Sequence, residues 1–243
     1  MADEEPEAKL WTQENIGPDL KNFPPPKVDF FQQRIIRKFH EIYYGSETDN
    51  PHTRTYRVSW MGYEMFKCPL DLWTYQEIIT KQKPDLIIET GTYRGGSALY
   101  LASLCDLLGQ GRVVTIDVDT SWTALLPRHP RITYLTGSSI DPAMFAQIAD
   151  LAAGERTLVI LDSDHRYDHV LAELRTYRSL VASGGYMIVE DTNVNGHPAF
   201  KKFGPGPWEA VSTFLGEDPD FYSDKSCERF LMTMNPNGFL RRR

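Results

Sequence analysis

Carboxylates follow several apolar segments of this chain, and two of them are adjacent. Glu190 and Asp191 come directly after the apolar run at 186–189, and Asp162 ends an earlier run that starts at residue 157. Adjacent carboxylates disfavour each other's ionised form unless a cation lies between them. Carboxylate oxygens are the ligands that Mg²⁺, Ca²⁺ and Mn²⁺ prefer. If the two runs are neighbouring strands, Asp162, Glu190 and Asp191 predict a site for a hard divalent cation.

A glycine-rich turn at 89–98, ETGTYRGGSA, predicts a second kind of ligand. Its glycines do not match the dinucleotide pattern G-x-G-x-x-G, but Gly91 lets the backbone approach a ligand closely. Asp117 ends the next apolar run, and an acid there can accept both hydroxyls of a ribose. The chain has no Walker-type lysine at this turn. These features favour S-adenosylmethionine (SAM), which has no phosphates, over NAD or ATP.

Alternating strand and helix patterns must bring these residues together. Apolar runs typical of buried parallel strands occupy 86–90, 112–117, 131–137, 157–162 and 186–190. Helical patterns occupy 97–108, 141–152 and 166–182, the second with Asp141 as N-cap and Pro142 at its first position. This order predicts an α/β fold with a doubly wound, mostly parallel sheet, whose ligands bind at the carboxyl ends of the strands.

The two ends of the chain have different patterns. Residues 1–27 are polar and end in three prolines, and an amphipathic helix is predicted from residue 28 on, with apolar positions Val28, Phe31, Ile35, Phe39 and Ile42. We therefore expect an N-terminal arm and helix over 1–54 and the main domain over 55–243. Residues 46–66 are predicted as loop, 70–82 and 207–216 as helices, and 230–234 as a strand at a late antiparallel edge.

Composition narrows the class of protein. A formal net charge of −7 argues against a general nucleic-acid-binding surface. The three cysteines have no paired short spacing, which fits a reducing compartment. No stretch approaches the roughly 20 apolar residues of a membrane span, and the acidic start lacks the apolar core of a signal peptide. We expect a cytoplasmic protein that binds neither nucleic acid nor membrane.

Several stretches, taken in order, resemble the cephalosporin hydroxylase/rhamnosyl O-methyltransferase family of SAM-dependent methyltransferases. The resemblance begins near residue 55 and continues to the end of the chain. The stretches are WMGYEMFKCPLDLWTYQEII (60–79), IIETGTYRGGSAL (87–99), VVTIDVD (113–119), LDSDH (161–165), IVEDTNVNGHP (188–198), GPGPWEAV (204–211) and RFLMTMNPNGFLRR (229–242).

The resemblance implies a role for each matching residue. Asp117 is expected to hold the ribose of SAM, and Ser138 and Ser139 to lie near the adenine. Asp162, Glu190 and Asp191 are expected to bind Mg²⁺, with Asp162 also bordering SAM; Asp164 is the alternative to Asp162. His165 is expected to be the general base, and His197 is the second candidate. The residues expected to shape the methionine end of the SAM pocket are Glu89, Gly91, Thr92, Tyr93 and Ser97.

The predicted reaction is methyl transfer from SAM to a hydroxyl of a small-molecule acceptor, such as a natural-product sugar. Mg²⁺ would lower the pKa of the hydroxyl, His165 would remove its proton, and the oxygen would attack the methyl group in line. Two alternatives stay open: an iron-dependent hydroxylase, which needs two histidines and one carboxylate, and a SAM-binding module without turnover. The family also suggests a homo-oligomer.

Overall fold

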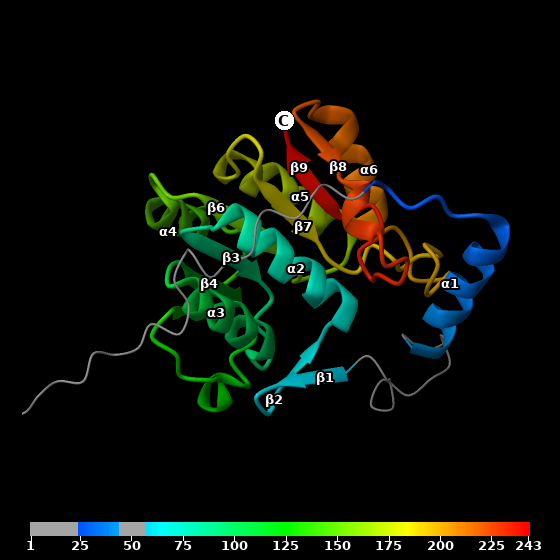
Figure 1. Ribbon diagram of the computed structural model, residues 1–243. Helices are drawn as coiled ribbons and strands as arrows, with labels where there is room; N and C mark the ends of the chain where they lie inside the picture. Colours follow the sequence, from blue (N-terminus) through cyan, green and yellow to red (C-terminus); the bar gives the residue numbers. More distant parts are fainter. Residues whose placement is uncertain (1–23, 44–56) are drawn as a thin grey trace, which may run out of the picture.

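The computed structural model describes residues 24–43 and 57–243, and its centre is a twisted seven-stranded sheet (Figure 1). The strands lie side by side in the order β5-β4-β3-β6-β7-β9-β8. The first five are parallel, whereas β9 is antiparallel to both β7 and β8. The strands are β3 (Leu86–Thr90), β4 (Arg112–Asp117), β5 (Ile132–Thr136), β6 (Thr157–Leu161), β7 (Tyr186–Val189), β8 (Phe221–Ser223) and β9 (Phe239–Arg242).

The predicted doubly wound, mostly parallel sheet with an antiparallel edge is confirmed. From β3 the chain moves outward to β4 and β5, and then returns to the other side of β3 to form β6 and β7. The strand order therefore reverses between β3 and β6. In open α/β sheets this reversal leaves a crevice at the carboxyl ends of the strands, where ligands bind.

Helices cover both faces of the sheet because successive strand residues point to opposite faces. Ile87 of β3 packs in one apolar cluster with α2 (Pro69–Gln82) and α3 (Gly96–Leu108). Its neighbours Leu86 and Ile88 pack in a second cluster with the helices of the opposite face. Those helices are α4 (Pro142–Ala152), α5 (Tyr167–Tyr177) and α6 (Pro207–Glu217). Asp141 caps α4 through its side chain, with Pro142 first in the helix, as predicted.

The loop predicted at 46–66 is wrong over its second half. Residues 57–66 form a hairpin of β1 (Arg57–Trp60) and β2 (Tyr63–Phe66), whereas 46–56 lie outside the described residues. The turn of the hairpin is Met61-Gly62, and both residues have positive φ angles, 50° and 89°. A two-residue turn of this kind matches the twist of paired strands, so it closes the hairpin without a longer loop.

The strand predicted at 230–234 is wrong, and β9 and β8 form the antiparallel edge instead. The backbone at Met234 bonds to other partners: its N–H donates to a carboxylate oxygen of Asp71 at 2.8 Å, and its carbonyl accepts from Asn193 at 3.1 Å. Met234 is buried in a small apolar cluster with Cys68 and Val194. The run is therefore apolar because it packs against α2 and the loop after β7. It does not join the sheet.

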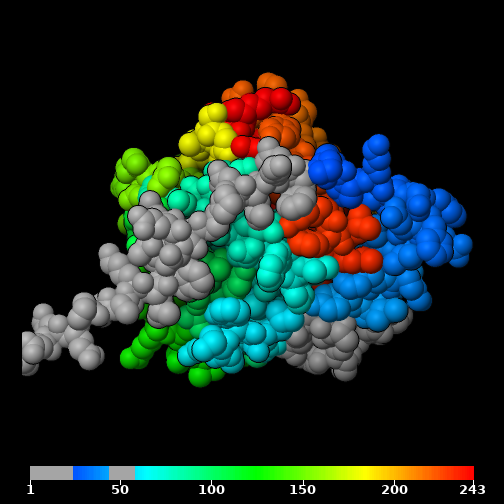
Figure 2. Space-filling model, in the orientation of Figure 1, coloured from blue at the N-terminus to red at the C-terminus, as the bar shows by residue number. Residues whose placement is uncertain are grey.

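The N-terminal helix, α1 (Phe30–Tyr43), lies at one side of the molecule, against the segment near the C-terminus (Figures 1 and 2). The helix forms as predicted, but two of its apolar positions, Phe31 and Ile42, are 69% and 66% exposed. The side chain buried instead is His40, which is 2% exposed. Among the described residues, no helix has the length and apolar character needed to cross a membrane.

Candidate active site

A cavity of about 780 Å³ lies at the carboxyl ends of the strands, where the strand order reverses. One part of its wall is the turn after β3, including Gly91 and Tyr93, together with Asp117 at the end of β4. Another part is the pair of loops after β6 and β7, with Asp162, His165 and Asp191. The residues predicted for the cofactor and those predicted for the metal thus share one continuous space.

Gly91 brings two strand ends into contact. Its φ angle is +89°, and a Cβ atom there would lie 1.9 Å from the carbonyl oxygen of Asp162. Any side chain would therefore separate β3 from the loop after β6. Gly96, at the start of α3, is similarly crowded, because a Cβ atom on it would lie 2.5 Å from the carbonyl oxygen of Glu64. The two glycines therefore allow the turn after β3 and the start of α3 to pack closely against the loop after β6 and against β2.

Asp117 fixes the turn that follows β3. Its Oδ2 atom accepts hydrogen bonds from the backbone N–H groups of Thr92 and Tyr93, each at 2.9 Å, and its Oδ1 accepts from the N–H of Asp119 at 2.9 Å. A carboxylate offers about four lone-pair positions. Asp117 therefore holds the turn and still has acceptor capacity toward the cavity. The ring of Tyr93 stacks on Phe66 of the hairpin, with centroids 4.8 Å apart.

Glu89 is a fully buried carboxylate with one oxygen available. Its Oε2 accepts from the hydroxyl of Thr115 at 2.8 Å, and Ser97 also hydrogen-bonds to the carboxylate. Its Oε1 is buried and has no hydrogen-bond partner in the described part of the chain. Burial raises the pKa of Glu89 to about 6. An unpartnered buried oxygen of this kind is costly unless a ligand supplies a donor.

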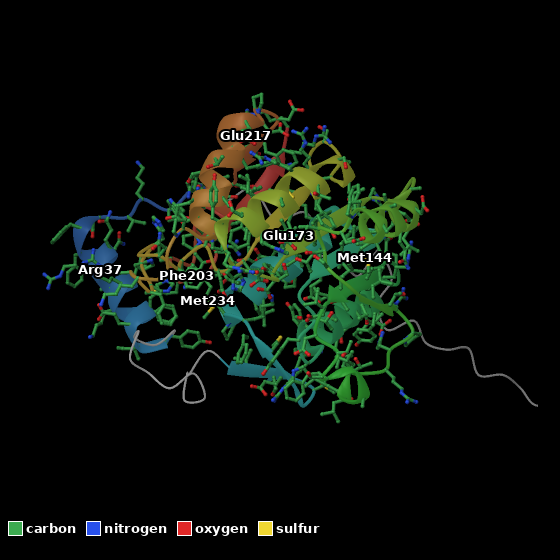
Figure 3. The ribbon with its side chains drawn as sticks, turned by 180° about the vertical axis from the view of Figure 1, so that it is seen from behind. Arg37, Met144, Glu173, Phe203, Glu217 and Met234 are labelled. Atoms are coloured by element: carbon green, nitrogen blue, oxygen red, sulfur yellow. The ribbon has the colours of Figure 1, made fainter. Side chains whose placement is uncertain are left out.

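Ser138 and Ser139 line the same cavity after β5. The Ser139 hydroxyl donates to Oε1 of Glu173 at 2.5 Å, and Ser163 donates to the same oxygen at 2.7 Å. Glu173 lies on α5 and is labelled in Figure 3. The Glu173 carboxylate thus joins the loops after β5 and β6, a connection that the sequence did not reveal.

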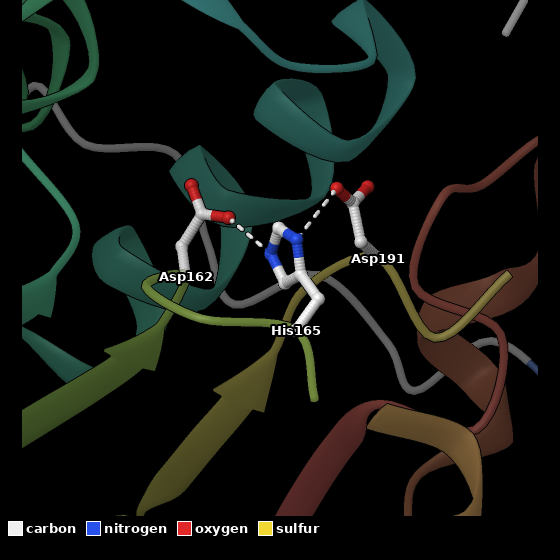
Figure 4. A group of neighbouring side chains, drawn as sticks. All are labelled: Asp162, His165 and Asp191. Atoms are coloured by element: carbon white, nitrogen blue, oxygen red, sulfur yellow. Dashed lines mark hydrogen bonds and ion pairs between the residues drawn. The ribbon is translucent and has the colours of Figure 1, made fainter. Parts of the chain in front are cut away.

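His165 lies between two carboxylates (Figure 4). Its Nε2 is 3.2 Å from Oδ1 of Asp162, and its Nδ1 is 3.6 Å from Oδ2 of Asp191. One ligand atom from each of these three residues lies within 4.8 Å of the others, the spacing of a possible metal site. Although burial disfavours a charged ring, Asp191 and Asp162 outweigh it and raise the pKa of His165 to about 9.

Glu190 points to a different set of partners. Its Oε1 accepts from the ammonium of Lys67 and from the hydroxyl of Tyr75, the latter at 2.6 Å. Lys67 also donates to Oδ2 of Asp162 at 2.5 Å. The structure therefore brings Asp162 and Asp191 together around His165, whereas Glu190 has only Oε2 left to offer a cation there.

Lys67 and Tyr75 were not among the residues predicted from the sequence. Lys67 lies in the short connection between β2 and α2, and its side chain is only 3% exposed. A lysine within the mainly apolar stretch MFKCP, just before a helix, was the only sequence signal available. Burial opposes its charge, yet Asp162 and Glu190 raise the pKa of Lys67 above its usual value. Lys67 and His165 in turn hold the pKa of Asp162 below its usual value despite burial.

The backbone turns sharply at Asp191. Its φ angle is +53°, in the left-handed region, which is uncommon for a residue with a side chain. The N–H of Asp191 donates to Oδ1 of Asn235 at 3.0 Å, and Nδ2 of Asn235 donates to the hydroxyl of Tyr75 at 3.0 Å. This turn directs the adjacent side chains of Glu190 and Asp191 to different neighbours.

The two alternative residues are engaged with other partners. Asp164 is paired with Arg166, whose Nε is 2.9 Å from Oδ2 of Asp164. His197 is 3.0 Å from Glu209 and stacks on Trp208, and it lines a second cavity of about 430 Å³. The geometry therefore favours Asp162 over Asp164 as the ligand and His165 over His197 as the base. Both assignments stay predictions.

Comparison with known proteins places the chain in a family. Residues 52–243 match the family model described as Rhamnosyl O-methyltransferase/CmcI. A rhamnosyl O-methyltransferase of Mycobacterium tuberculosis is 41% identical over 213 residues, covering 85% of this chain and 84% of that protein. The rhamnosyl O-methyltransferase of Mycobacterium leprae is 37% identical over 214 residues, covering 86% of this chain and 91% of that protein.

Solved structures share the fold at lower identity. A CmcI structure described as holding Mg and SAM superposes with a TM-score of 0.61 at 21% identity, over 93% of this chain and 89% of that one. An apo structure of CmcI gives a TM-score of 0.59 at 21% identity, over 93% and 88%. The chain belongs to the rhamnosyl O-methyltransferase/CmcI family, and the prediction of a SAM-dependent O-methyltransferase is confirmed.

Proposed function

We propose that the 780 Å³ cavity binds SAM and an acceptor hydroxyl together, with a divalent cation, and that the chain methylates a hydroxyl of a sugar-bearing small molecule. The observation that carries this proposal is the single cavity, whose wall includes both the glycine turn after β3 and the group of Asp162, His165 and Asp191. Methyl transfer in line requires the two reactants to lie in one space, and holding them in the reactive orientation supplies much of the rate.

The cofactor end of the cavity fits SAM. The buried Oε1 of Glu89 would accept from the ammonium of the methionine part, which supplies the donor that this oxygen otherwise lacks. Asp117 would accept from the ribose hydroxyls with its remaining lone pairs. Thr92, Tyr93 and Ser97 would shape the methionine end, and Ser138 and Ser139 the adenine end. SAM supplies an electrophilic methyl group when bound.

The acidic end of the cavity fits a hard divalent cation such as Mg²⁺. Asp162 and Asp191 would be its main ligands, because oxygen atoms from both converge on one region. Glu190 is the third proposed ligand. It would bind the cation with Oε2, because its Oε1 accepts hydrogen bonds from Lys67 and Tyr75. A bound cation of this kind lowers the pKa of a coordinated hydroxyl. The hydroxylase alternative fits less well, because this group has one histidine and two carboxylates, the reverse of the iron triad.

His165 would act as the general base only after it loses its proton. Asp162 and Asp191 stabilise the protonated ring when no metal ion is bound. A cation that takes up the charge of these carboxylates removes that stabilisation, so the ring becomes neutral at physiological pH and can accept a proton. Binding of the cation and activation of the base are therefore coupled in this proposal.

The acceptor is proposed to be a rhamnosyl group, as the names of the mycobacterial relatives indicate. Four aromatic side chains, Phe66, Tyr93, Phe200 and Phe203, border the same cavity as the acidic group. Rhamnose is a 6-deoxy sugar, so it carries a methyl group and an apolar face that can pack on aromatic rings. Its hydroxyls would then face the carboxylates and His165.

The test is a methyltransfer assay with SAM and 4-nitrophenyl α-L-rhamnoside, followed by mass spectrometry for a gain of one methyl group. We expect product with Mg²⁺ and none with excess EDTA. Asp162→Asn is expected to abolish turnover. Asp168→Asn is the matched control, because Asp168 is an exposed acid of the same segment and lies outside the cavity. Transfer that continues in EDTA, or that survives Asp162→Asn, would refute the proposed metal site.

Three further expectations stay predictions. They are the homo-oligomer, the cytoplasmic location, and the division into an arm over 1–54 and a methyltransferase domain over 55–243.

A further inference from the structure

Lys67 is a buried cation in contact with two acids of the candidate site. Its Nζ is 2.5 Å from Oδ2 of Asp162 and also donates to Oε1 of Glu190. The side chains of Lys67 and Glu190 are 3% and 4% exposed, and that of Asp162 is 19% exposed. A buried ion pair with this geometry loses most of its hydration, so removing one partner leaves the other uncompensated.

The contacts of Lys67 separate the carboxylates into two groups. Glu190 is held on one side by Lys67 and Tyr75, whereas Asp191 faces His165 on the other side. Asp162 belongs to both groups, with Oδ2 on Lys67 and Oδ1 on His165. The charge of Lys67 therefore acts on Asp162 at the place where a divalent cation would bind.

We propose that Lys67 is a positioning residue: a fixed counter-cation that holds Asp162 and Glu190 in place without metal and limits the affinity of the site for a divalent cation. The proposal rests on the proposed metal site. Lys67 is tethered and cannot dissociate, so the acidic group keeps its arrangement between rounds of metal binding. Its repulsion also weakens the binding of any second cation beside Asp162.

The first experiment titrates Mn²⁺ into the full-length protein without SAM and follows free Mn²⁺ by electron paramagnetic resonance. Lys67→Met should bind Mn²⁺ at least about tenfold more tightly than the wild type, because one nearby positive charge is removed. Lys225→Met is the matched control. Lys225 also pairs with an acid, with its Nζ 2.8 Å from Oε1 of Glu228, but neither residue lines the cavity. An affinity for Mn²⁺ that is unchanged by Lys67→Met overturns the proposal.

The second experiment covers the case in which Lys67→Met does not fold. Thermal unfolding in EDTA is compared for Lys67→Met and for the double variant Lys67→Met/Glu190→Gln. The double variant removes the uncompensated acid, so it should recover at least half of the lost melting temperature, or fold where the single variant does not. A double variant as unstable as the single one overturns the proposal, because Lys67 would then only fill space.

The Mn²⁺ results separate this inference from the proposed function. If the wild type binds no Mn²⁺ but Lys67→Met does, the site exists and the role of Lys67 stands, but the proposal that the wild type uses a bound cation fails. If both bind with equal affinity, the metal site stands and the role of Lys67 fails. If neither binds, both fail.

Discussion

Acid should weaken the packing of α1 against the loop that carries Asp191, and His40 is the residue responsible. The Nδ1 atom of His40 lies 3.1 Å from Nδ2 of Asn193, which can donate only if Nδ1 carries no proton. Burial lowers the pKa of His40 to about 4 from its ordinary value of 6.5. Protonation is therefore disfavoured in the folded chain, so this contribution to stability is full above pH 6.5 and is lost as the pH falls toward 4.

The size of the effect follows from the shift. At about 1.36 kcal/mol per pKa unit the full loss is about 3 kcal/mol, and about 2 kcal/mol of it has occurred at pH 5. Hydrogen–deuterium exchange, corrected for the intrinsic effect of pH, measures the loss locally. Protection of the amides in residues 30–43 should fall roughly 20-fold between pH 7 and pH 5.

His40→Phe provides the comparison, because it keeps a ring of similar size that cannot be protonated. This variant should show weaker protection at pH 7, since Asn193 loses its partner, but little further loss at pH 5. Equal pH dependence in the wild type and in His40→Phe would refute the reasoning and would assign the effect to other groups.

Three further predictions concern the cavity. Asp191→Asn and Glu190→Gln should each abolish metal-dependent activity but leave SAM binding within about threefold of wild type by calorimetry, because Glu190 contacts Lys67 and Tyr75 and Asp191 faces His165; a parallel loss of SAM binding would contradict this separation. Gly91→Ala should destabilise the chain by at least about 2 kcal/mol in urea unfolding, because its Cβ would meet the carbonyl oxygen of Asp162; unchanged stability would show that β3 and the loop after β6 can separate. His165→Gln should slow single-turnover methyl transfer about 100-fold or more with saturating Mg²⁺, and near-wild-type turnover would remove His165 from the mechanism.

The sheet could be predicted largely from the sequence because its signals are local. Each parallel strand is a short apolar run, and several are followed by a residue that a buried strand would exclude, such as Asp117 or Asp162. Parallel strands place these ends at one edge, so their meeting follows from the strand order alone. The N-cap of α4 was equally readable, since Asp141 and Pro142 are adjacent.

Other features depend on contacts between distant residues. Lys67 is 95 and 123 residues from its partners Asp162 and Glu190, and no periodic pattern records such a pairing. The orientation of Glu190 could not be predicted either, because it depends on the positive φ angle of Asp191 and on Asn235. The run at 230–234 was assigned to a strand because apolar content alone does not distinguish burial in a sheet from burial against a loop.

The left-handed backbone at Asp191 also affects how this position can evolve. That conformation costs a residue with a side chain about 1 kcal/mol, and it costs glycine almost nothing. Selection for thermal stability alone should therefore favour glycine at 191 and remove the carboxylate in the same step. Asparagine tolerates the conformation too, but it has no negative charge. Selection for the activity favours aspartate here, because its carboxylate faces His165 and would bind the cation. Replacement of Asp191 by glycine in a diverged copy of this chain would therefore indicate that this selection has been lost.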